Sequence, residues 1–330
     1  MHRCNSVVTI TKLPPPAGAA PSRNGSLLDK VLQLRIFGKS PVGAFLLMND
    51  WTWNHLPGSF TNLRPVYWYG HFLHALVRRW GSRRQYFGTF FLRNRPQLEL
   101  IRLLSCRAEN ASGLSMAVLG CSNGAEVYSI LATLRSSRPE LKVVMHAVDI
   151  SKEVLEIAQK GAYSFAAPEL VGERIFQRMT AAEMRATFDR QAGQLVIQPW
   201  IKDGIIWHVG DVRLPETTKL LGPQDIVVAN NLLCHMNPRD AETCLRGIAR
   251  LVQPGGYLVV SGIDLNVRAK VATDQKWKPV TELLEEIHDG DSSLRRDWPM
   301  NYWGLEPLDT SRSNWVVRYA TAFQINERRV

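Results

Sequence analysis

Apolar and polar positions follow a regular pattern along the second part of the chain. From Met116 onward, short apolar runs are separated by helix-length stretches in which apolar residues recur every three or four positions. Such a run predicts a β-strand and such a stretch predicts a helix, so the pattern favours a parallel α/β sheet. The predicted strands are 116–120, 143–150, 204–212, 225–232, 256–262 and one within 315–325, and the predicted helices are 125–135, 152–160 and 238–252.

The pattern before Met116 is different and has two parts. Residues 1–26 are rich in Pro, Ala, Gly and Ser with little apolar periodicity, which predicts a flexible tail. Residues 27–107 are rich in aromatic residues and arginine, and segment 69–80 places apolar residues at helical spacing. We therefore expect a mainly helical N-terminal unit over 27–107, followed by a main domain over 108–330.

Composition excludes several classes of protein. With 45% apolar and 21% charged residues, the 330-residue chain is neither disordered nor fibrous. It has no run of about 18 apolar residues and no secretory leader, so we expect a cytoplasmic protein without a membrane span. The five cysteines are scattered with no C-x-x-C pair, so we expect reduced thiols and no metal site.

The positive charge of the chain is concentrated in one segment. The formal net charge is +10, and residues 64–107 hold nine arginines and one acid, Glu99. Such a segment attracts nucleic acid, anionic lipid or an acidic small molecule, or forms a solvated surface. The charge alone does not choose among these alternatives.

A glycine loop follows the first predicted strand. The strand runs into Gly120-Cys121-Ser122-Asn123-Gly124 and then into a helix, and the second strand ends at Asp149. Glycine lets backbone N–H groups approach a ligand closely, and a carboxylate at this strand end accepts ribose hydroxyls. The glycines are four apart, with Ser122 where G-x-G-x-x-G has its second glycine, which disfavours NAD. The loop suits S-adenosylmethionine, and the alternative is a tight turn that binds nothing.

The residues around the loop carry a resemblance to a known family. The segment GCSNGAEVYS (120–129) resembles G/A-x-S-T-G-E-E-P-Y-S of the chemoreceptor glutamate methyltransferases, the CheR-type S-adenosylmethionine-dependent family. Residues 147–164 and 225–260 resemble the family's next motifs in order, TFFLR (89–93) matches T-x-F-F-R, and 195–212 is similar to its small β-subdomain. The resemblance covers about 86–264 and implies a Rossmann-like class I methyltransferase sheet with an inserted β-subdomain.

Site residues follow from the resemblance, position by position. It implies a lid at Thr89 and Arg93, a Glu126 near the methionine amino group, and an adenine edge at Asp211 and Val212. The predicted cofactor residues are Thr89, Arg93, Gly120, Ser122, Gly124, Glu126, Asp149, Ile150, Asp211, Val212, Asn230, Asn231 and Leu232, and the catalytic candidates are Arg93, Asn231 and His235.

The sequence departs from the family pattern at the acceptor site. An arginine of the family is Asn230 here and a tyrosine is His235, although an arginine fork is a natural clamp for a carboxylate. A neutral His235 imidazole is a candidate base, or a packed, hydrogen-bonded side chain. The unmatched segment 283–308 holds three aromatic residues and an acidic cluster. The aromatic residues Trp298, Tyr302 and Trp303 either wall an acceptor pocket or pack in the core, and the cluster Glu285, Glu286, His288, Asp289 and Asp291 is a solvated helix end or a metal site.

Our interpretation is an S-adenosylmethionine-dependent methyltransferase acting on a small-molecule acceptor with a carboxylate, hydroxyl, amine or thiol. The alternatives are O-methylation of protein glutamate as in the family, RNA methylation through the arginine-rich segment, and a cofactor-binding regulatory module without turnover. Arg78, Arg79, Arg83, Arg84 and Arg95 either draw in an anionic acceptor or only keep the protein in solution.

Overall fold

The computed structural model describes residues 41–57, 60, 63–80, 88–108, 113–164 and 175–326. The predicted tail, residues 1–26, lies outside them. The chain divides into two compact units after Ser82, whereas the sequence placed the boundary after residue 107. The difference is due to helix α5 (Arg95–Ala108), which packs against the main sheet and α6 (Ala125–Ser137). Each unit is described by itself below.

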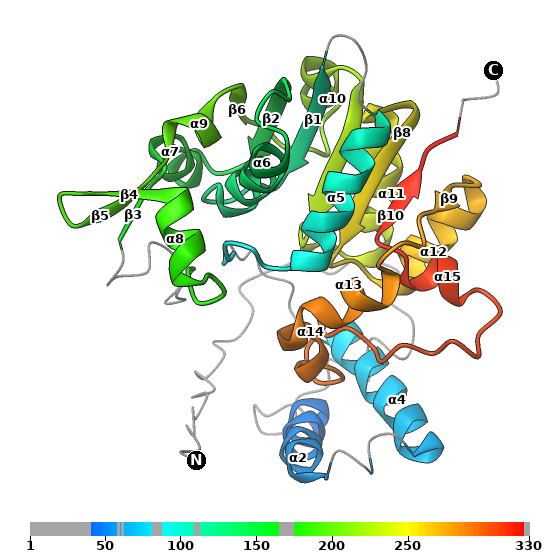
Figure 1. The fold of residues 1–330 in the computed structure, drawn as a ribbon. Helices are drawn as coiled ribbons and strands as arrows, with labels where there is room; N and C mark the ends of the chain where they lie inside the picture. The colour runs from blue at the N-terminus through cyan, green and yellow to red at the C-terminus, as the bar shows by residue number, and fades with distance from the viewer. Residues whose placement is uncertain are drawn as a thin grey trace. The chain divides into compact units, whose positions relative to one another are not determined.

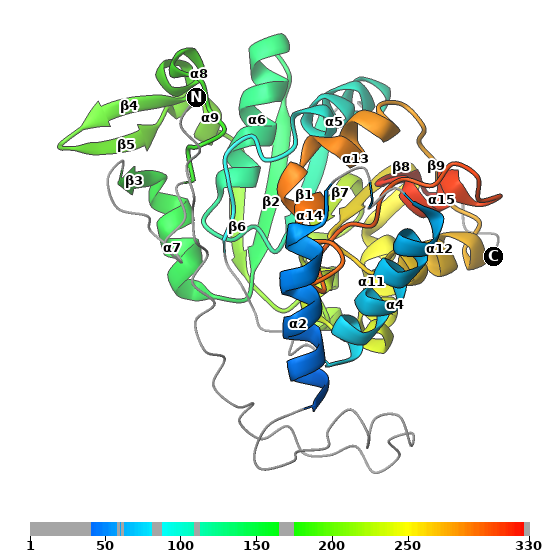
Figure 2. The same cartoon turned by 90° about the horizontal axis from the view of Figure 1, so that it is seen from below.

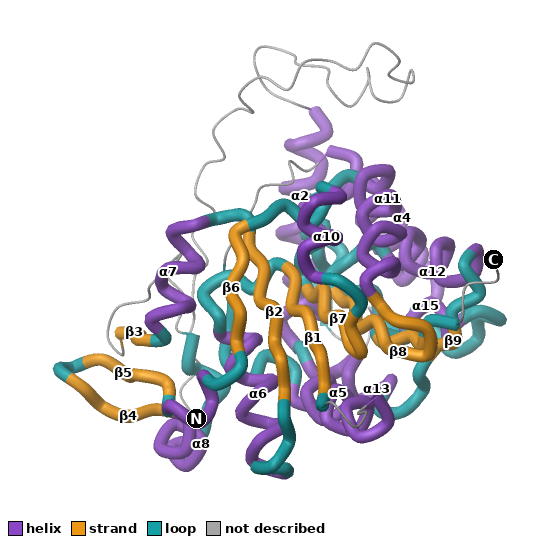
Figure 3. The backbone as a smooth tube through the Cα atoms, turned by 90° about the horizontal axis from the view of Figure 1, so that it is seen from above, coloured by secondary structure: helices purple, strands orange, loops and turns teal. Residues whose placement is uncertain are grey.

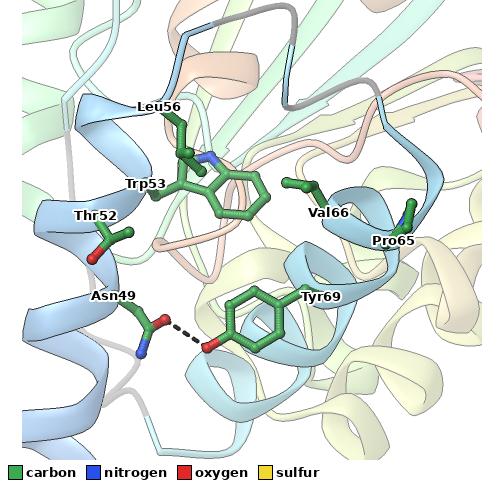
Figure 4. A pocket seen from close by; sticks show the side chains of 7 residues that line it. All are labelled: Asn49, Thr52, Trp53, Leu56, Pro65, Val66 and Tyr69. Atoms are coloured by element: carbon green, nitrogen blue, oxygen red, sulfur yellow. Dashed lines mark hydrogen bonds between the residues drawn. The ribbon is translucent and has the colours of Figure 1, made fainter.

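The described residues of the first unit are mainly helical, as the sequence predicts. They include helices α2 (Pro41–His55) and α4 (Arg64–Trp80), and the Tyr69 hydroxyl on α4 donates to Asn49 Oδ1 on α2 at 2.6 Å. A small cavity lies between the two helices (Figure 4). It contains none of the predicted cofactor residues, because its lining residues are Asn49, Thr52, Trp53, Leu56, Pro65, Val66 and Tyr69.

The second unit is built on a seven-stranded sheet (Figure 1). Its order is β6-β2-β1-β7-β8-β10-β9, and the first five strands are parallel to one another. Strand β10 runs antiparallel to both of its neighbours. The bounds are β1 Leu114–Leu119, β2 Val143–Asp149, β6 Ile205–Val209, β7 Gln224–Asn230, β8 Val252–Ser261, β9 Lys278–Pro279 and β10 Ala322–Gln324.

Helices cover both faces of this sheet, and Figure 3 shows α5 and α6 on the side opposite α10 (Pro215–Leu221), α11 (Pro238–Ile248) and α12 (Leu265–Asp274). Alternate residues of β1 therefore enter different apolar cores. Met116 and Val118 pack with Ile101 and the other buried residues of α5 and α6. Ala117 and Leu119 pack with residues of α11 and α12 such as Leu245. Burial on both faces accounts for the continuous apolar runs that predicted these strands.

A small second sheet is inserted between β2 and β6. Its order is β3-β5-β4, all antiparallel, and Figure 2 shows it beside α7 (Lys152–Lys160) and α8 (Ala181–Thr187). A capping box starts α8, in which Thr180 and Glu183 satisfy each other's backbone N–H groups. The predicted α/β sheet with an inserted β-subdomain is confirmed. The strands are β3 Ala162–Ser164, β4 Phe188–Gln191 and β5 Gln194–Ile197.

The last part of the chain differs most from its prediction. The strand predicted within 315–325 is present as β10, but it occupies only the end of this segment, and the first residues form a short helix, α15 (Trp315–Tyr319). The predicted helix 238–252 ends earlier, because a 3₁₀ turn at Ala249–Leu251 leads directly into β8. The remaining helices are α9 (Pro199–Lys202), a 3₁₀ turn (Leu233–His235), α13 (Leu284–Gly290) and α14 (Ser292–Arg296).

The strand order fixes where a ligand binds. Along the chain the sheet grows from β1 outward to β6 and then continues at β7, on the other side of β1. Open α/β sheets bind ligands beside the carboxyl ends of the strands at such a switch. Gly120, Asp149 and Asn230 all lie at these ends. Within the described part of the chain, no helix is long and apolar enough to cross a membrane.

Candidate active site

The glycine loop has a tight backbone conformation. Gly120, Ser122 and Gly124 have φ values of 71°, 48° and 87°, and the N–H groups of Gly120 and Cys121 donate to the Val148 carbonyl at 2.8 and 3.0 Å. A Cβ at Gly124 would lie 3.0 Å from Tyr128 Cε2. Glycine is therefore required here both for its positive φ and for close packing of the loop. The loop ends at α6, as predicted.

Asp149 holds this loop in place. Its carboxylate is buried and accepts the backbone N–H of Ser122 at 2.8 Å and that of Ser151 at 3.0 Å, one at each oxygen. Each oxygen keeps a second lone pair, so the predicted ribose contact remains compatible with these bonds. Ile150, the predicted adenine neighbour, is half exposed beside it.

Asp211 and Val212 follow β6, as the prediction for the adenine edge requires. Val212 is buried, and Gly210 donates its N–H to the Asp149 carbonyl at 2.9 Å. The Asp211 carboxylate accepts Arg213 Nε at 2.9 Å, and hydrogen bonding to this guanidinium lowers the pKa of Asp211. Asp211 is thus placed beside the predicted cofactor site with its carboxylate already engaged by Arg213.

A buried polar network joins β7, α6 and α5. The Asn230 amide donates to Glu126 Oε1 at 2.6 Å and to Gln97 Oε1 at 3.0 Å, and Ser261 Oγ donates to Asn230 Oδ1 at 2.7 Å. Burial raises the pKa of Glu126, and the Asn230 hydrogen bond and the charge of Arg93 counteract this only in part. The network brings Glu126 and Asn230 together, as the resemblance implies.

Gln97 is a candidate site residue that the sequence analysis missed. Its side chain is buried, and among the described residues its Nε2 amide has no hydrogen-bond acceptor. Leaving a buried donor unsatisfied costs about 1–3 kcal/mol. The available signal was a polar residue on the apolar face of α5, between positions such as Leu98 and Ile101 that enter the core.

The end of β7 packs directly on the glycine loop. Asn231 has a φ of 54°, and its N–H donates to the Ser261 carbonyl at 3.0 Å. A Cβ at Gly120 would lie 3.1 Å from Leu232 Cδ1, so Leu232 covers this glycine. His235 is partly exposed, and its Nδ1 lies 3.3 Å from the Tyr302 hydroxyl. His235 is therefore hydrogen-bonded, and which ring nitrogen carries the proton depends on the role of Tyr302.

Arg93 of the predicted lid and Arg178, from the region before α8, pack on one aromatic ring. The guanidinium carbons of Arg93 and Arg178 lie 5.7 and 4.7 Å from the Phe90 ring centroid. Both arginines bond to Asp291, through Arg93 Nε at 2.8 Å and Arg178 Nη2 at 3.0 Å. The backbone N–H of Leu92 donates to Ser129 Oγ at 3.0 Å and so fixes this segment to α6. Thr89 is partly exposed immediately before it.

The arginine-rich segment 64–107 is neutralised in part. Arg95 pairs with Glu183, Arg102 with Glu99, and Arg107 with Glu282. Arg95, one of the arginines proposed to attract an anionic acceptor, is thus paired with an acid while remaining partly exposed. Arg83 and Arg84 lie outside the described residues.

The aromatic and acidic candidates of segment 283–308 separate into different roles. Trp298 is buried, Trp303 donates Nε1 to Asp297 Oδ2 at 2.7 Å, and Tyr302 bonds to a predicted site residue, His235. The acidic residues Glu285, Glu286 and Asp289 are exposed, whereas His288 and Asp291 are buried. In the described part of the chain, no three His, Cys, Asp or Glu side chains gather as metal ligands.

The chemistry of these side chains fits the methionine end of S-adenosylmethionine. That end carries an ammonium and a carboxylate. Glu126 supplies an anionic acceptor for the first, and the unsatisfied Gln97 Nε2 supplies a buried donor for the second. The glycine loop and Asp149 lie at the neighbouring strand ends, where the adenosine is expected. The residues therefore fit the cofactor.

Comparison with known proteins also indicates a binding site for S-adenosylmethionine. Residues 88–273 match the family described as CheR methyltransferase, SAM binding domain. The chain is 28% identical over 170 residues to chemotaxis protein methyltransferases of Vibrio parahaemolyticus and Vibrio cholerae, and the match covers 49% of this chain and 58% of each relative. The chain thus matches little more than half the length of these relatives.

Several solved methyltransferase structures match part of the fold of this chain, and two of them serve as examples. One is the N-methyltransferase NodS from Bradyrhizobium japonicum (TM-score 0.34, 14% identity, 58% of this chain and 78% of that chain). Another is the magnesium protoporphyrin IX methyltransferase ChlM from Synechocystis (TM-score 0.31, 16% identity, 56% of this chain and 71% of that chain). The family match covers the glycine loop, Asp149 and the β7 end, and it confirms both the resemblance and the predicted cofactor. By this match the chain belongs to the family of CheR methyltransferases.

Proposed function

We propose that this chain transfers the methyl group of S-adenosylmethionine to a carboxylate side chain of a protein. The observation that carries the proposal is the network of Glu126, Asn230 and Gln97 beside the glycine loop, inside the family match. The chemotaxis protein methyltransferases among its relatives support a protein acceptor over the small molecule that we expected from the sequence.

The cofactor supplies an activated methyl group on a sulfonium. When bound, the cofactor would supply this methyl group to a carboxylate oxygen of the acceptor, and the electron pair of the broken C–S bond would stay on sulfur. The products are a methyl ester and S-adenosylhomocysteine. The protein aligns the two groups and excludes water, effects that contribute several kcal/mol. Glu126 and Gln97 hold the amino-acid end, and Asp149 holds the adenosine end.

His235 and Tyr302 suit a carboxylate acceptor. When both side chains are neutral, Tyr302 and His235 together have two polar hydrogens. One lies in the hydrogen bond between Tyr302 Oη and His235 Nδ1, and the other is carried either by Tyr302 Oη or by His235 Nε2. The pair therefore carries a second polar hydrogen whichever way it is arranged. A carboxylate accepts such a donor and needs no base to remove a proton.

A second candidate acceptor is a small molecule with a hydroxyl or amine. The observation in its favour is Asn230, which stands where the family has an arginine and whose amide is already bonded to Glu126 and Gln97. A neutral acceptor needs no arginine clamp, and His235 would then serve as the base.

The test is methyl transfer from radiolabelled S-adenosylmethionine. The purified protein is incubated with an extract of its own cells, divided into protein, RNA and small molecules. We expect label in protein that is released as volatile methanol in mild base. Base-stable label in small molecules would favour the second candidate, label sensitive to ribonuclease would favour RNA, and tight binding of NAD without S-adenosylmethionine binding would overturn the assignment.

A further inference from the structure

A segment outside the family match docks on the predicted lid. The match ends at residue 273, whereas α13 and α14 follow at Leu284–Gly290 and Ser292–Arg296. The carboxylate of Asp291, between these helices, bonds to Arg93 Nε at 2.8 Å and to Arg178 Nη2 at 3.0 Å. One buried carboxylate therefore links three segments, which are the lid, the region before α8, and the junction between α13 and α14.

The docking is close and involves more than this ion pair. Asn94 Nδ2 donates to the Ile287 carbonyl at 2.8 Å, and a Cβ at Gly290 would lie 2.5 Å from Asn94 Oδ1. The residue after Arg93 is thus in direct contact with α13. Such contacts fix the backbone on both sides of the Arg93–Asp291 bond and leave the arginine little freedom to turn.

The bond uses only part of the Arg93 guanidinium. Asp291 accepts from Nε, and no residue in the described part of the chain accepts from Nη1 or Nη2 of Arg93. The positive charge of Arg93 acts on the Glu126 carboxylate and opposes part of the rise in its pKa that burial causes. The terminal nitrogens therefore belong to a segment that the Leu92 N–H ties to Ser129 of α6, the helix that carries Glu126. Their fork matches the two oxygens of a carboxylate.

We propose that Asp291 is a positioning residue that holds Arg93 through Nε so that Nη1 and Nη2 bind a carboxylate in the active site. This inference rests on the proposed function. A carboxylate is present both in the methionine part of the cofactor and in the proposed acceptor. The inference makes the segment after the family match a part of the site.

The test compares two ligands that differ in their carboxylate. S-Adenosylhomocysteine carries it, and 5′-methylthioadenosine lacks the whole amino-acid group. If Arg93 binds the cofactor, Asp291→Asn weakens the titrated affinity for S-adenosylhomocysteine about tenfold and leaves that for 5′-methylthioadenosine unchanged. If Arg93 binds the acceptor, both affinities stay the same and the KM for labelled protein rises about tenfold. Either result supports the proposal.

Two further variants separate positioning from a loss of structure. Arg93→Lys keeps the charge but lacks the fork, so it should reproduce the Asp291→Asn pattern. Asp289→Asn removes an exposed carboxylate of α13 that pairs with Arg295, and it should change nothing. Equal weakening of both ligands by Asp291→Asn, or no change in either affinity or KM, overturns the proposal. Absence of S-adenosylhomocysteine binding by the unmodified protein would instead overturn the proposed function.

Discussion

Asn230 donates its side-chain amide to the Glu126 carboxylate across 2.6 Å, which joins the end of β7 to the first turn of α6. The bond stabilises the ionised carboxylate, yet burial outweighs it and the pKa of Glu126 remains raised. The charge that Glu126 offers to the cofactor's ammonium is thus sensitive to pH. A buried carboxylate of this kind is typical of a binding site.

The first prediction concerns this charge. Glu126→Gln keeps the shape but removes the anion, so the affinity for S-adenosylmethionine should fall about 10- to 100-fold, as for a lost charged hydrogen bond. In the unmodified protein, affinity should decrease as the pH falls through the raised pKa of Glu126, because protonation removes the charge. Calorimetric titrations at several pH values check both effects.

The pH dependence distinguishes Glu126 from other acids. In Glu126→Gln, the fall in affinity on acidification should be absent or much smaller. Glu140→Gln is a suitable control, because Glu140 is an exposed glutamate whose nearest cation, Arg138 Nε, lies 3.5 Å away. If Glu126→Gln bound the cofactor normally, the methionine end would have to lie elsewhere.

A second prediction uses the unsatisfied amide of Gln97. Gln97→Met has a similar volume and removes both the unpaired donor and the acceptor for Asn230. Loss of the hydrogen bond from Asn230 destabilises the protein, whereas removal of the buried, unsatisfied Nε2 group stabilises it. The two effects oppose each other, so the midpoint of thermal unfolding should change by only a few degrees. Affinity for S-adenosylmethionine should fall about tenfold. An unchanged affinity would show that Gln97 does not contact the cofactor.

A third prediction concerns Tyr302 and His235. Tyr302→Phe removes the hydroxyl that lies 3.3 Å from His235 Nδ1, so it should lower kcat about tenfold and leave the affinity for S-adenosylmethionine unchanged. His235→Ala should behave in the same way. Tyr69→Phe, which also removes one hydrogen-bonded tyrosine hydroxyl but in the other unit, should keep full activity. Loss of cofactor affinity in Tyr302→Phe would place the pair at the cofactor instead.

A fourth prediction separates two roles of Asp149. Asp149→Ala leaves the N–H groups of Ser122 and Ser151 without their acceptor, so it should abolish cofactor binding and also destabilise the protein. Asp149→Asn keeps one carbonyl oxygen and should fold better while binding the cofactor poorly. Circular dichroism measures how far each variant folds, and calorimetry measures how tightly each binds the cofactor. Normal binding by Asp149→Asn would show that the carboxylate serves the loop alone.

The sequence predicted the central sheet because its strands are buried on both faces. Residues such as Val118 and Val228 lie in continuous apolar runs. The glycine loop between β1 and α6 became specific only together with the residues that follow it. The adjacency of Asp149, Asn230 and Glu126 followed from the family resemblance. Parallel strand ends also meet at one edge, so their residues were expected to lie together.

The sequence could not predict how the last part of the chain packs. Strand β9 has two residues, and α13 and α14 have seven and five, which is too short for a recognisable period. Asp291 was grouped with acids expected to be solvated, and only long-range contacts with Arg93 and Arg178 show that it is buried. Gln97 was missed because its signal, one polar residue on the apolar face of α5, is weak when taken alone.

The last prediction is an acid-dependent loss of stability at Asp291. Burial alone would raise the pKa of this carboxyl, but the charge of Arg93 and the hydrogen bonds from Ser293, Arg93 and Arg178 lower it to about 2. An aspartate in the unfolded chain titrates near 3.8. The ionised form therefore stabilises the fold above about pH 4, by about 2 kcal/mol, and this contribution is lost as the pH falls from 4 towards 2.

Asp291→Asn should consequently lower the free energy of unfolding by about 2 kcal/mol at pH 7 and by much less at pH 2.5. Urea unfolding at both pH values measures the difference. Glu183→Gln is the matched comparison, because the pKa of Glu183 is also about 2 but its pair with Arg95 is much more exposed. Solvent screens that pair, so its effect should be smaller and should decrease further in high salt, whereas the effect of Asp291 should persist. Equal destabilisation by Asp291→Asn at both pH values would mean that shape, and not charge, joins this segment to the lid.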